Sequence, residues 1–386
     1  FMLDVKAQPL KRAQQEVGKE NLMKSRAAGK SASLYADHSV LASGAWAKIR
    51  VSQSGIHQLT DAVVRQAGFS NINKVKIYGY GGNLQNEALI AGELKKLDDL
   101  QEVPQCIVDG KHYFYAKGPV SWEDKTSIQR IRNPYSDYGY YFITQTGEEP
   151  AQMDSATFIS TYFPQAEDYH SLYEKDGYSW FPGGRNLFDP TEVPLGGKQQ
   201  VAIVNQTGSS NGKLTVGVTM GVNGSVEVQK NGVYLGTITL QKSVASDASY
   251  QMAVESFATY PLKDLSEKDT ITLLPKTGGP MHLDYVAMTW EKPVPFPGFT
   301  GMVPAAQYVY GITNQDHHAD GAADMVIIIP TSQKLLKQAK RLKEFHETHD
   351  GLRVTIVPAD ELYNEFASGT PDANAYRRYL RMLYDK

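Results

Sequence analysis

Two groups of residues could bind a metal ion through histidine nitrogens and carboxylate oxygens. Neither group is supported by an HExxH motif or by paired cysteines. Polar loops that contain histidine are commoner than metal sites, and cationic side chains are favoured near a helix C-terminus. The composition therefore favours solvated histidines. The candidates are His317 and His318 with Asp316 and Asp320, and the pair His346 and His349.

Cys106 is the single cysteine, so no disulfide can form within the chain. A catalytic thiol needs a pKa lowered by a histidine or a helix N-terminus. Cys106 instead precedes Ile107 and Val108 in a predicted strand, which indicates a small buried apolar side chain. No Ser/His/Asp set or defined carboxylate pair appears elsewhere in the sequence.

Two further groups of residues could contact a ligand. The run from Gly79 to Gly82 resembles a phosphate-binding loop but lacks the following Lys-Ser/Thr, so a tight turn at a strand end is favoured. A string of aromatic residues could form a platform for a carbohydrate or peptide, but a strand and loop packing between two domains is favoured. These aromatic residues are Tyr135, Tyr138, Tyr140, Tyr141 and Phe142, with Trp122 and Trp180.

The length and composition indicate a folded chain of several domains. At about 100–200 residues per domain, the 386 residues predict two or three domains. The net charge of -3 argues against a nucleic-acid-binding protein, and no apolar run is long enough to span a membrane.

Hydrophobic periodicity predicts a multidomain α+β protein. Residues 1–44 read as an N-terminal arm, and residues 45–135 as a small α/β unit with Thr60 capping a helix. Short alternating runs with Asn223-Gly224 and Asn231-Gly232 turns predict an antiparallel, jelly-roll-like β-sandwich over 136–292. Residues 293–322, rich in Pro and Gly at the start, are predicted to form a linker.

Residues 323–386 predict the start of a parallel-sheet α/β domain. Two apolar strands, Met325–Ile329 and 354–357, flank an amphipathic helix, and a second helix over 372–385 follows an N-cap at Thr370. Two strands do not make a stable domain, so we expect a further strand after Lys386. We also expect the helix over 372–385 to be the least anchored element.

Several segments, in this order, resemble gingipain-like cysteine peptidases. Residues 324–386 resemble the opening of their catalytic domain, and 283–286 with Trp290 resemble the last strand of their sandwich. The remaining segments are 43–51, 55–60, 67–69, 75–82 (VKIYGYGG), 98–104 (DDLQEVP), 114–122 (FYAKGPVSW) and 133–144 (NPYSDYGYYFIT).

The resemblance implies a cysteine peptidase of caspase-like fold that needs no cofactor, in which a histidine assists a thiolate nucleophile. It is greatest to the sortase branch, which serves type IX secretion in Bacteroidetes. Enzymes of that branch lie at the cell surface, where their partner is the outer-membrane secretion machinery. They cleave C-terminal signals from secreted cargo proteins and attach the cargo to the cell surface.

The resemblance places the catalytic His and Cys beyond Lys386, so no residue of this chain is expected to be catalytic and the segment alone is expected to be inactive. Ligands of parallel sheets bind at strand carboxyl ends. Pro330, Thr331, Pro358 and Asp360 should therefore border the site. An alternative is a non-enzymatic β-sandwich that binds glycan or protein at the cell surface.

Overall fold

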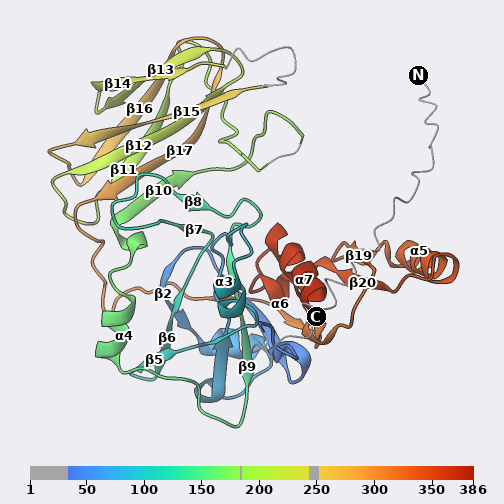
Figure 1. Ribbon diagram of the computed structural model, residues 1–386. Helices are drawn as coiled ribbons and strands as arrows, with labels where there is room; N and C mark the ends of the chain where they lie inside the picture. The colour runs from blue at the N-terminus through green and yellow to red at the C-terminus, as the bar shows by residue number, and fades with distance from the viewer. Residues whose placement is uncertain (1–33, 183–184, 243–251) are drawn as a thin grey trace, which may run out of the picture.

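The computed structural model of the protein describes residues 34–182, 185–242 and 252–386. It has three parts (Figure 1): a first unit of small antiparallel sheets, a β-sandwich, and a C-terminal α/β part. The predicted α+β class is therefore confirmed. Most of the predicted arm, residues 1–33, lies outside the described residues. In the part of the chain that the structure describes, no helix is long and apolar enough to cross a membrane.

The first unit is built on a sheet with the strand order β18-β1-β9-β3-β4 and a smaller sheet β2-β6-β5. Thr60 caps the predicted helix by accepting a hydrogen bond from the Val63 amide, and Asp109-Gly110 form the predicted hairpin turn with positive φ angles of 50° and 73°. The elements are η1 (Val40–Ala42), β1 (Trp46–Val51), β2 (Gly55–Leu59), α2 (Asp61–Gln66), η2 (Ile72–Lys74), β3 (Val75–Tyr78), α3 (Ala91–Lys96), β4 (Glu102–Val103), β5 (Gln105–Val108), β6 (Lys111–Ala116), β7 (Val120–Ser121), β8 (Ile131–Arg132) and β9 (Gly139–Gln145).

The region predicted as a linker contains two elements. Strand β18 (Gln307–Ile312) pairs antiparallel with β1, with Trp46 opposite Ile312, and η4 (His317–Ala319) follows it. The sequence conceals this strand because its partner lies about 260 residues earlier in the chain and because Pro and Gly dominate the residues before it. Residues 307–312 thus return the chain from the sandwich to the first unit.

The sandwich stacks the sheet β10-β17-β12-β15 on the sheet β11-β16-β13-β14. Its core consists of inward-facing side chains from both sheets, among them the fully buried Leu214, Val216, Val226 and Leu273. The strands are β10 (His170–Glu174), β11 (Gln199–Val204), β12 (Gly212–Met220), β13 (Gly224–Lys230), β14 (Val233–Leu240), β15 (Val254–Leu262), β16 (Lys268–Thr277) and β17 (Met281–Trp290); α4 (Ser155–Tyr162) and η3 (Ala166–Tyr169) precede them.

One predicted sandwich turn is wrong and one is confirmed. Asn231-Gly232 join β13 to β14 as a hairpin, with φ angles of 50° and 80°. Asn223-Gly224 instead connect β12 to β13, which belong to different sheets. Turn chemistry alone predicted a hairpin there, but neither Asn223 nor Gly224 has the positive φ angle of such a turn, and the chain crosses here from one sheet to the other.

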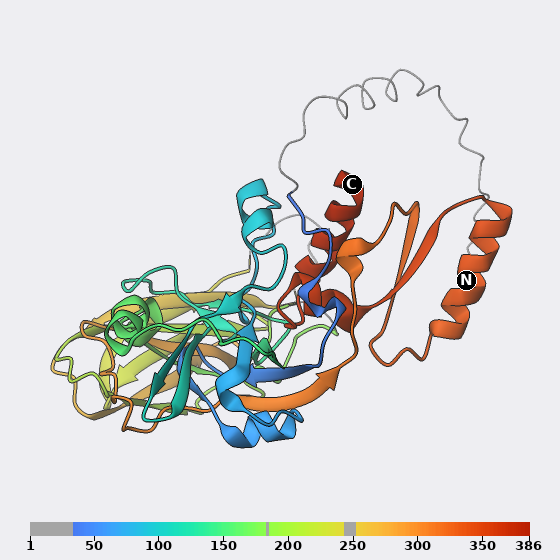
Figure 2. The ribbon, with the colours of Figure 1, turned by 90° about the horizontal axis from the view of Figure 1, so that it is seen from below.

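The C-terminal part contains the predicted parallel pair. β19 (Met325–Ile329) and β20 (Val354–Pro358) align Met325 with Val354, and α5 (Leu336–His349) connects them. Figure 2 shows this pair between α5 on one side and two helices on the other, α6 (Ala359–Phe366) and α7 (Ala373–Asp385). Helix α6 was not predicted, and Asp372, not Thr370, caps α7 by accepting from the Asn374 amide at 2.8 Å.

The expectation about anchoring is wrong. Helix α7 buries Ala375, Tyr379 and Met382 against α6, whereas α5 buries only Ala339 and exposes Leu342 and Phe345. β19 is also only half-buried along most of its length. Further contacts of α7 come from the first unit, where Arg378 donates to Gln85 Oε1 and to the Leu97 carbonyl, and from Tyr35, which donates to Asp385. The periodicity of 372–385 does not reveal these partners.

Candidate functional site

The carboxyl ends of β19 and β20 meet at one edge of the parallel pair. Ile329 lies opposite Pro358, so Pro330 and Thr331 leave one strand where the other strand ends. Pro330 and Thr331 are exposed, and Asp360 is half-buried with an Oδ1 atom that accepts no hydrogen bond from the described residues. The four predicted border residues are thus adjacent, but they do not combine a nucleophile with a base.

A buried lysine of the first unit lies close to this edge. Lys48, on β1, is 5% exposed; its Nζ donates to the Gly369 carbonyl at 2.5 Å and to Asn364 Oδ1 at 3.2 Å. The ammonium also lies 4.4 Å from the centroid of the Tyr140 ring. Burial lowers the pKa of Lys48 to about 7, an effect that the Asp360 carboxylate partly opposes. Lys48 therefore joins β1 to α6 and to the turn that follows it.

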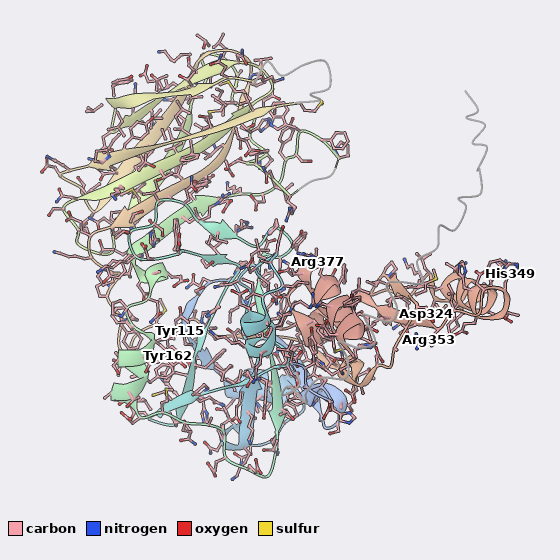
Figure 3. The ribbon with its side chains drawn as sticks, viewed as in Figure 1. Tyr115, Tyr162, Asp324, His349, Arg353 and Arg377 are labelled. Atoms are coloured by element: carbon pink, nitrogen blue, oxygen red, sulfur yellow. The ribbon has the colours of Figure 1, made fainter. Side chains whose placement is uncertain are left out.

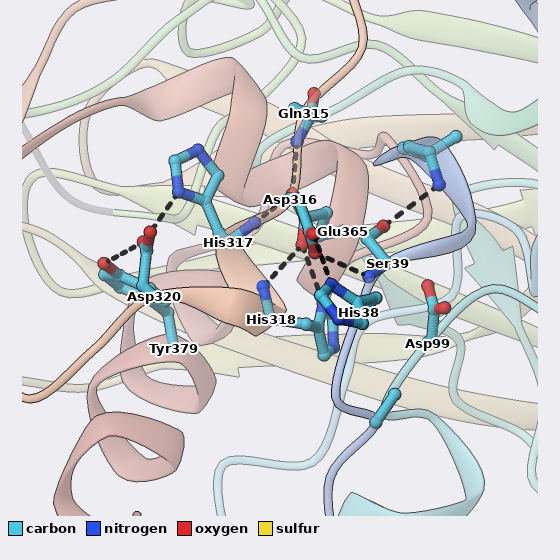
Figure 4. A network of polar contacts seen from close by, with 12 residues as sticks. His38, Ser39, Asp99, Gln315, Asp316, His317, His318, Asp320, Glu365 and Tyr379 are labelled. Atoms are coloured by element: carbon cyan, nitrogen blue, oxygen red, sulfur yellow. Dashed lines mark hydrogen bonds and ion pairs between the residues drawn. The ribbon is translucent and has the colours of Figure 1, made fainter. Parts of the chain in front are cut away.

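His318, a candidate metal ligand for which the sequence favours a solvated position, is instead part of a buried ionic network (Figure 4). Its Nδ1 lies 2.7 Å from Glu365 Oε2, and its Nε2 lies 3.1 Å from the Asp98 carbonyl. The ring stacks on Phe366 at a centroid distance of 4.6 Å. His318 thus connects η4 to α6 and to the loop before β4.

His317 makes a second set of contacts in the same network. Its Nδ1 lies 2.8 Å from Asp320 Oδ2 and its Nε2 lies 2.7 Å from Glu361 Oε2, while Tyr379 donates to Asp320 at 2.7 Å. Burial works against the protonated form of both histidines, but their carboxylate partners outweigh it and raise the pKa of each to about 10. Both rings are therefore imidazolium ions at neutral pH.

Each ring nitrogen of His317 and His318 faces a carboxylate or carbonyl oxygen at 2.7–3.1 Å, so the four nitrogens are already engaged in hydrogen bonds. Within the described ranges, no group of three or more His, Cys, Asp or Glu side chains could hold a metal ion. The expectation of solvated histidines is wrong for His317 and His318, because Glu361 and Glu365 approach them from α6. His346 and His349 both bind Asp350, at 2.6 and 2.7 Å, near the end of α5 where Figure 3 labels His349.

The N-terminal segment completes the network. Asp316 accepts from the Ser39 amide at 2.8 Å and contacts His38 at 2.7 Å. The Val40 amide donates to Asp99 at 2.9 Å. Residues 38–40 are thereby held between the loop before β4 and η4.

The predicted tight turn after β3 receives the loop between α6 and α7. Ser368 Oγ accepts from the Tyr80 amide at 2.9 Å and donates to the Tyr140 carbonyl at 3.0 Å. Gly79 has a φ of 138°, and a Cβ added there would lie 2.6 Å from Ser368 Oγ. Glycine is needed at this position for the backbone angle and for the close approach, not for a phosphate.

Cys106 and the aromatic string have packing roles. Cys106 is fully buried on β5 among Tyr113 and Phe158, and burial raises the pKa of its thiol. Trp122 stacks on His170 at 3.9 Å. Tyr141 and Phe142 lie in the core of the first unit, whereas Tyr135 is partly exposed. Trp180 contacts Tyr178 and His282.

Comparisons with known proteins agree with the arrangement of the C-terminal part. Residues 318–386 match the family model of Peptidase family C25. A solved structure of dimeric latent PorU from Porphyromonas gingivalis is similar over 95% of this chain and 41% of that chain, with 24% identity and a TM-score of 0.72. No curated protein sequence matches.

Two carbohydrate-binding modules are similar to a smaller part of the chain. A CBM35 module from Cellvibrio japonicus covers 31% of this chain and 91% of its own, with 14% identity and a TM-score of 0.22. A CBM6 module from Clostridium stercorarium, in complex with cellobiose, covers 31% and 94%, with 17% identity and a TM-score of 0.21. The resemblance predicted from the sequence is confirmed by the other two findings: residues 318–386 match Peptidase family C25, and the chain has the fold of part of latent PorU.

Proposed function

We propose that the chain is part of a sortase-type cysteine peptidase that removes C-terminal signals from secreted cargo proteins and attaches the cargo to the cell surface. The support is the combination of a family C25 match over residues 318–386 with a PorU-like fold over almost the whole chain. The chain spans about two fifths of the PorU chain that it matches. Cleavage and attachment are therefore proposed for the whole protein.

Within that protein, the edge formed by β19 and β20 would border the catalytic site. Pro330, Thr331, Pro358 and Asp360 lie where parallel sheets bind their ligands. Among the described residues we assign no nucleophile, because the only thiol, Cys106, is buried in β5 of the first unit. The residues of the border would position substrate but would not react with it.

The proposed partners are cargo proteins with a C-terminal sorting signal and the outer-membrane machinery of type IX secretion, and the proposed location is the cell surface. The alternative of a non-enzymatic sandwich that binds glycan or protein is less well supported, because it leaves the family C25 match of 318–386 without a role.

Cargo processing in cells tests the proposal. The complete gene is deleted and then restored, and the mass and surface attachment of a cargo with a C-terminal signal are measured. Without the gene, cargo should keep its signal and lose surface attachment, and a thiol-reactive inhibitor applied to restored cells should reproduce the loss. Normal cargo processing in the deletion strain would rule the proposal out.

The isolated chain provides a separate test of Cys106. Residues 1–386 are incubated with peptide substrates and a thiol-reactive probe. No turnover of the peptides is expected, and the probe should label Cys106 only after denaturant exposes the thiol. Turnover that disappears in Cys106→Ala would instead make Cys106 a nucleophile and contradict the assignment.

A further inference from the structure

A cavity of about 260 Å³ lies where the sandwich meets the first unit, away from the β19–β20 edge. Four carboxylates line it, from Glu174, Asp176, Glu255 and Asp284. Three arginines line it as well: Arg130, Arg132 and Arg185. Such a concentration of charge within one cavity needs explanation, because charged side chains are buried only when they are paired.

The outer face of one sandwich sheet brings the carboxylates together. Glu174 ends β10 and lies opposite Tyr285 of β17, so Asp284 is on the neighbouring strand. Gly217 occupies β12 at this level, and a Cβ there would lie 3.1 Å from Asp284 Oδ2. The glycine therefore leaves the space over the Asp284 carboxylate open.

The arginines satisfy only part of this acidic set. Arg130 Nε donates to Glu174 Oε1 at 3.1 Å, and its Nη2 donates to Asp284 Oδ1 at 3.0 Å. Arg132 Nε lies 2.5 Å from Asp176 Oδ2. Glu174 Oε2 lies 3.8 Å from Arg132 Nη1, too far for a hydrogen bond, and among the described residues neither Glu174 Oε2 nor Asp176 Oδ1, both buried, accepts one. The Glu174 side chain is 2% exposed, so this oxygen faces the interior of the site rather than bulk solvent.

The charge balance is also negative. Arg132 is shared with Asp137 at 2.7 Å, and Arg185 binds Glu87 at 2.6 Å. Three guanidinium groups therefore face six carboxylates, namely the four that line the cavity and those of Asp137 and Glu87. Burial, together with Glu174, Glu255 and Asp176 and against the effect of Arg130, raises the pKa of Asp284 to about 7. Among the described residues, the arginines of the site are therefore outnumbered by the carboxylates that they contact or face.

We propose that this cavity binds the ammonium or guanidinium group of an organic cation. Such a group supplies N–H donors for Glu174 Oε2 and Asp176 Oδ1 and compensates the excess negative charge. A metal ion is the other way to supply positive charge, but the carboxylates of the described residues are not grouped for one. The cation can come from a free amine or from a Lys or Arg side chain of a polypeptide, and binding does not depend on peptidase activity.

Calorimetric titration of the whole chain at pH 7 tests the proposal with three probes of similar shape. Butylguanidinium and butylammonium should bind, and butylurea, the neutral counterpart of butylguanidinium, should bind at least tenfold more weakly. Binding should also release protons, because a cation lowers the pKa of Asp284, so the measured enthalpy should change with the ionisation enthalpy of the buffer. Equal binding of butylurea, or no binding of either cation, would overturn the proposal, as would displacement of the cation by an equal concentration of Ca²⁺.

Variants locate the binding. Asp284→Asn and Glu255→Gln each remove one negative charge with little change in size and should weaken butylguanidinium binding at least tenfold. Glu255 is the second residue of β15 and accepts from Asn186 Nδ2 at 2.9 Å, so this variant is expected to fold even if Asp284→Asn does not. Glu291→Gln, just after β17 outside the cavity lining, is the matched control and should bind normally. Unchanged affinity in both cavity variants would overturn the proposal.

Two blocked peptides distinguish the sources of the cation. They differ only in carrying arginine or its neutral analogue citrulline. Tighter binding of the arginine peptide than of butylguanidinium would identify a polypeptide side chain as the ligand, and weaker binding would identify a small free cation; both results support a cation site. Equal binding of the arginine and citrulline peptides would contradict it.

Discussion

At the scale of single residues, His318 is the most heavily constrained ionised side chain of the C-terminal part. It is fully buried and is held between Glu365 and Asp98. Removing one member of a buried ion pair leaves the other charge uncompensated, which costs about 3–5 kcal/mol. We therefore expect His318→Gln to lower the free energy of unfolding by about that amount.

Urea denaturation followed by circular dichroism measures this loss. His349→Gln is the matched control, because His349 is exposed and contacts only the exposed Asp350 carboxylate and the Phe345 ring; it should change stability by less than about 0.5 kcal/mol. Equal stability of the two variants would show that the network contributes little to the fold.

Lys48 and the two network histidines should affect the pH dependence of stability in opposite directions. The raised pKa of His317 and His318 stabilises the fold fully below about pH 6.5, and this contribution is lost as the pH rises to about 10. The lowered pKa of Lys48 penalises the fold at low pH, and the penalty is relieved as the pH rises from about 7 to 10.5.

Of these two opposing contributions to the pH dependence, Lys48→Met leaves only that of His317 and His318. The free energy of unfolding should then fall more steeply between pH 7 and pH 10 than it does in the wild type, and denaturation midpoints at several pH values measure the difference. Parallel pH profiles for the two proteins would show that Lys48 is not titrating in this range. Lys276→Met, a half-exposed lysine of the sandwich, is the control.

At the scale of elements, the fit between Gly79 and Ser368 joins the α6–α7 loop to the first unit. Gly79→Ala would place a methyl group 2.6 Å from Ser368 Oγ and 2.9 Å from Tyr141 Cδ1, at a φ of 138° that other residues rarely adopt. We expect a loss of about 1–3 kcal/mol and faster proteolysis between the first unit and β19. Gly147→Ala is the control, since nothing lies within 4 Å of its added Cβ; similar proteolysis of both variants would contradict this docking role.

The sequence predicts elements well where the determinants are local. The apolar runs of β19 and β20 and the amphipathic helix between them lie within 34 residues and share one unit, so periodicity is sufficient. Periodicity is insufficient for β18, where Gln307 contacts Arg50 from 257 residues away. It is also insufficient for His318, whose partner Asp98 lies 220 residues away. The sequence does contain one signal for the histidine network. Glu361 and Glu365 are four residues apart, so on a helix they lie on the same face and can both reach the adjacent histidines.

At the scale of the whole molecule, the sandwich has a core of its own. The fully buried members of the cluster around Val216 and Leu273 all come from residue 193 onward. Tyr173 of β10 packs against them, and β10 completes one sheet from residue 170. Helix α4 instead packs Phe158 against Cys106 of the first unit. The boundary of the sandwich is thus best placed near residue 165, so we predict that residues 165–292 fold without the rest of the chain.

That fragment should be less stable than the sandwich within the whole chain. It loses Trp122, which covers Tyr285 and Ala287 of the outer sheet face, and Arg130, which binds Glu174 and Asp284. Cooperative urea unfolding with a β-type circular dichroism spectrum is expected, at a lower midpoint than the sandwich shows in the whole chain. Trp122→Ala in the whole chain should shift the midpoint in the same direction, because it removes the same cover from Tyr285. A fragment that is unfolded and digested at once would show that the sandwich depends on the first unit for its fold, because its own core would then fail to offset the chain entropy that folding removes.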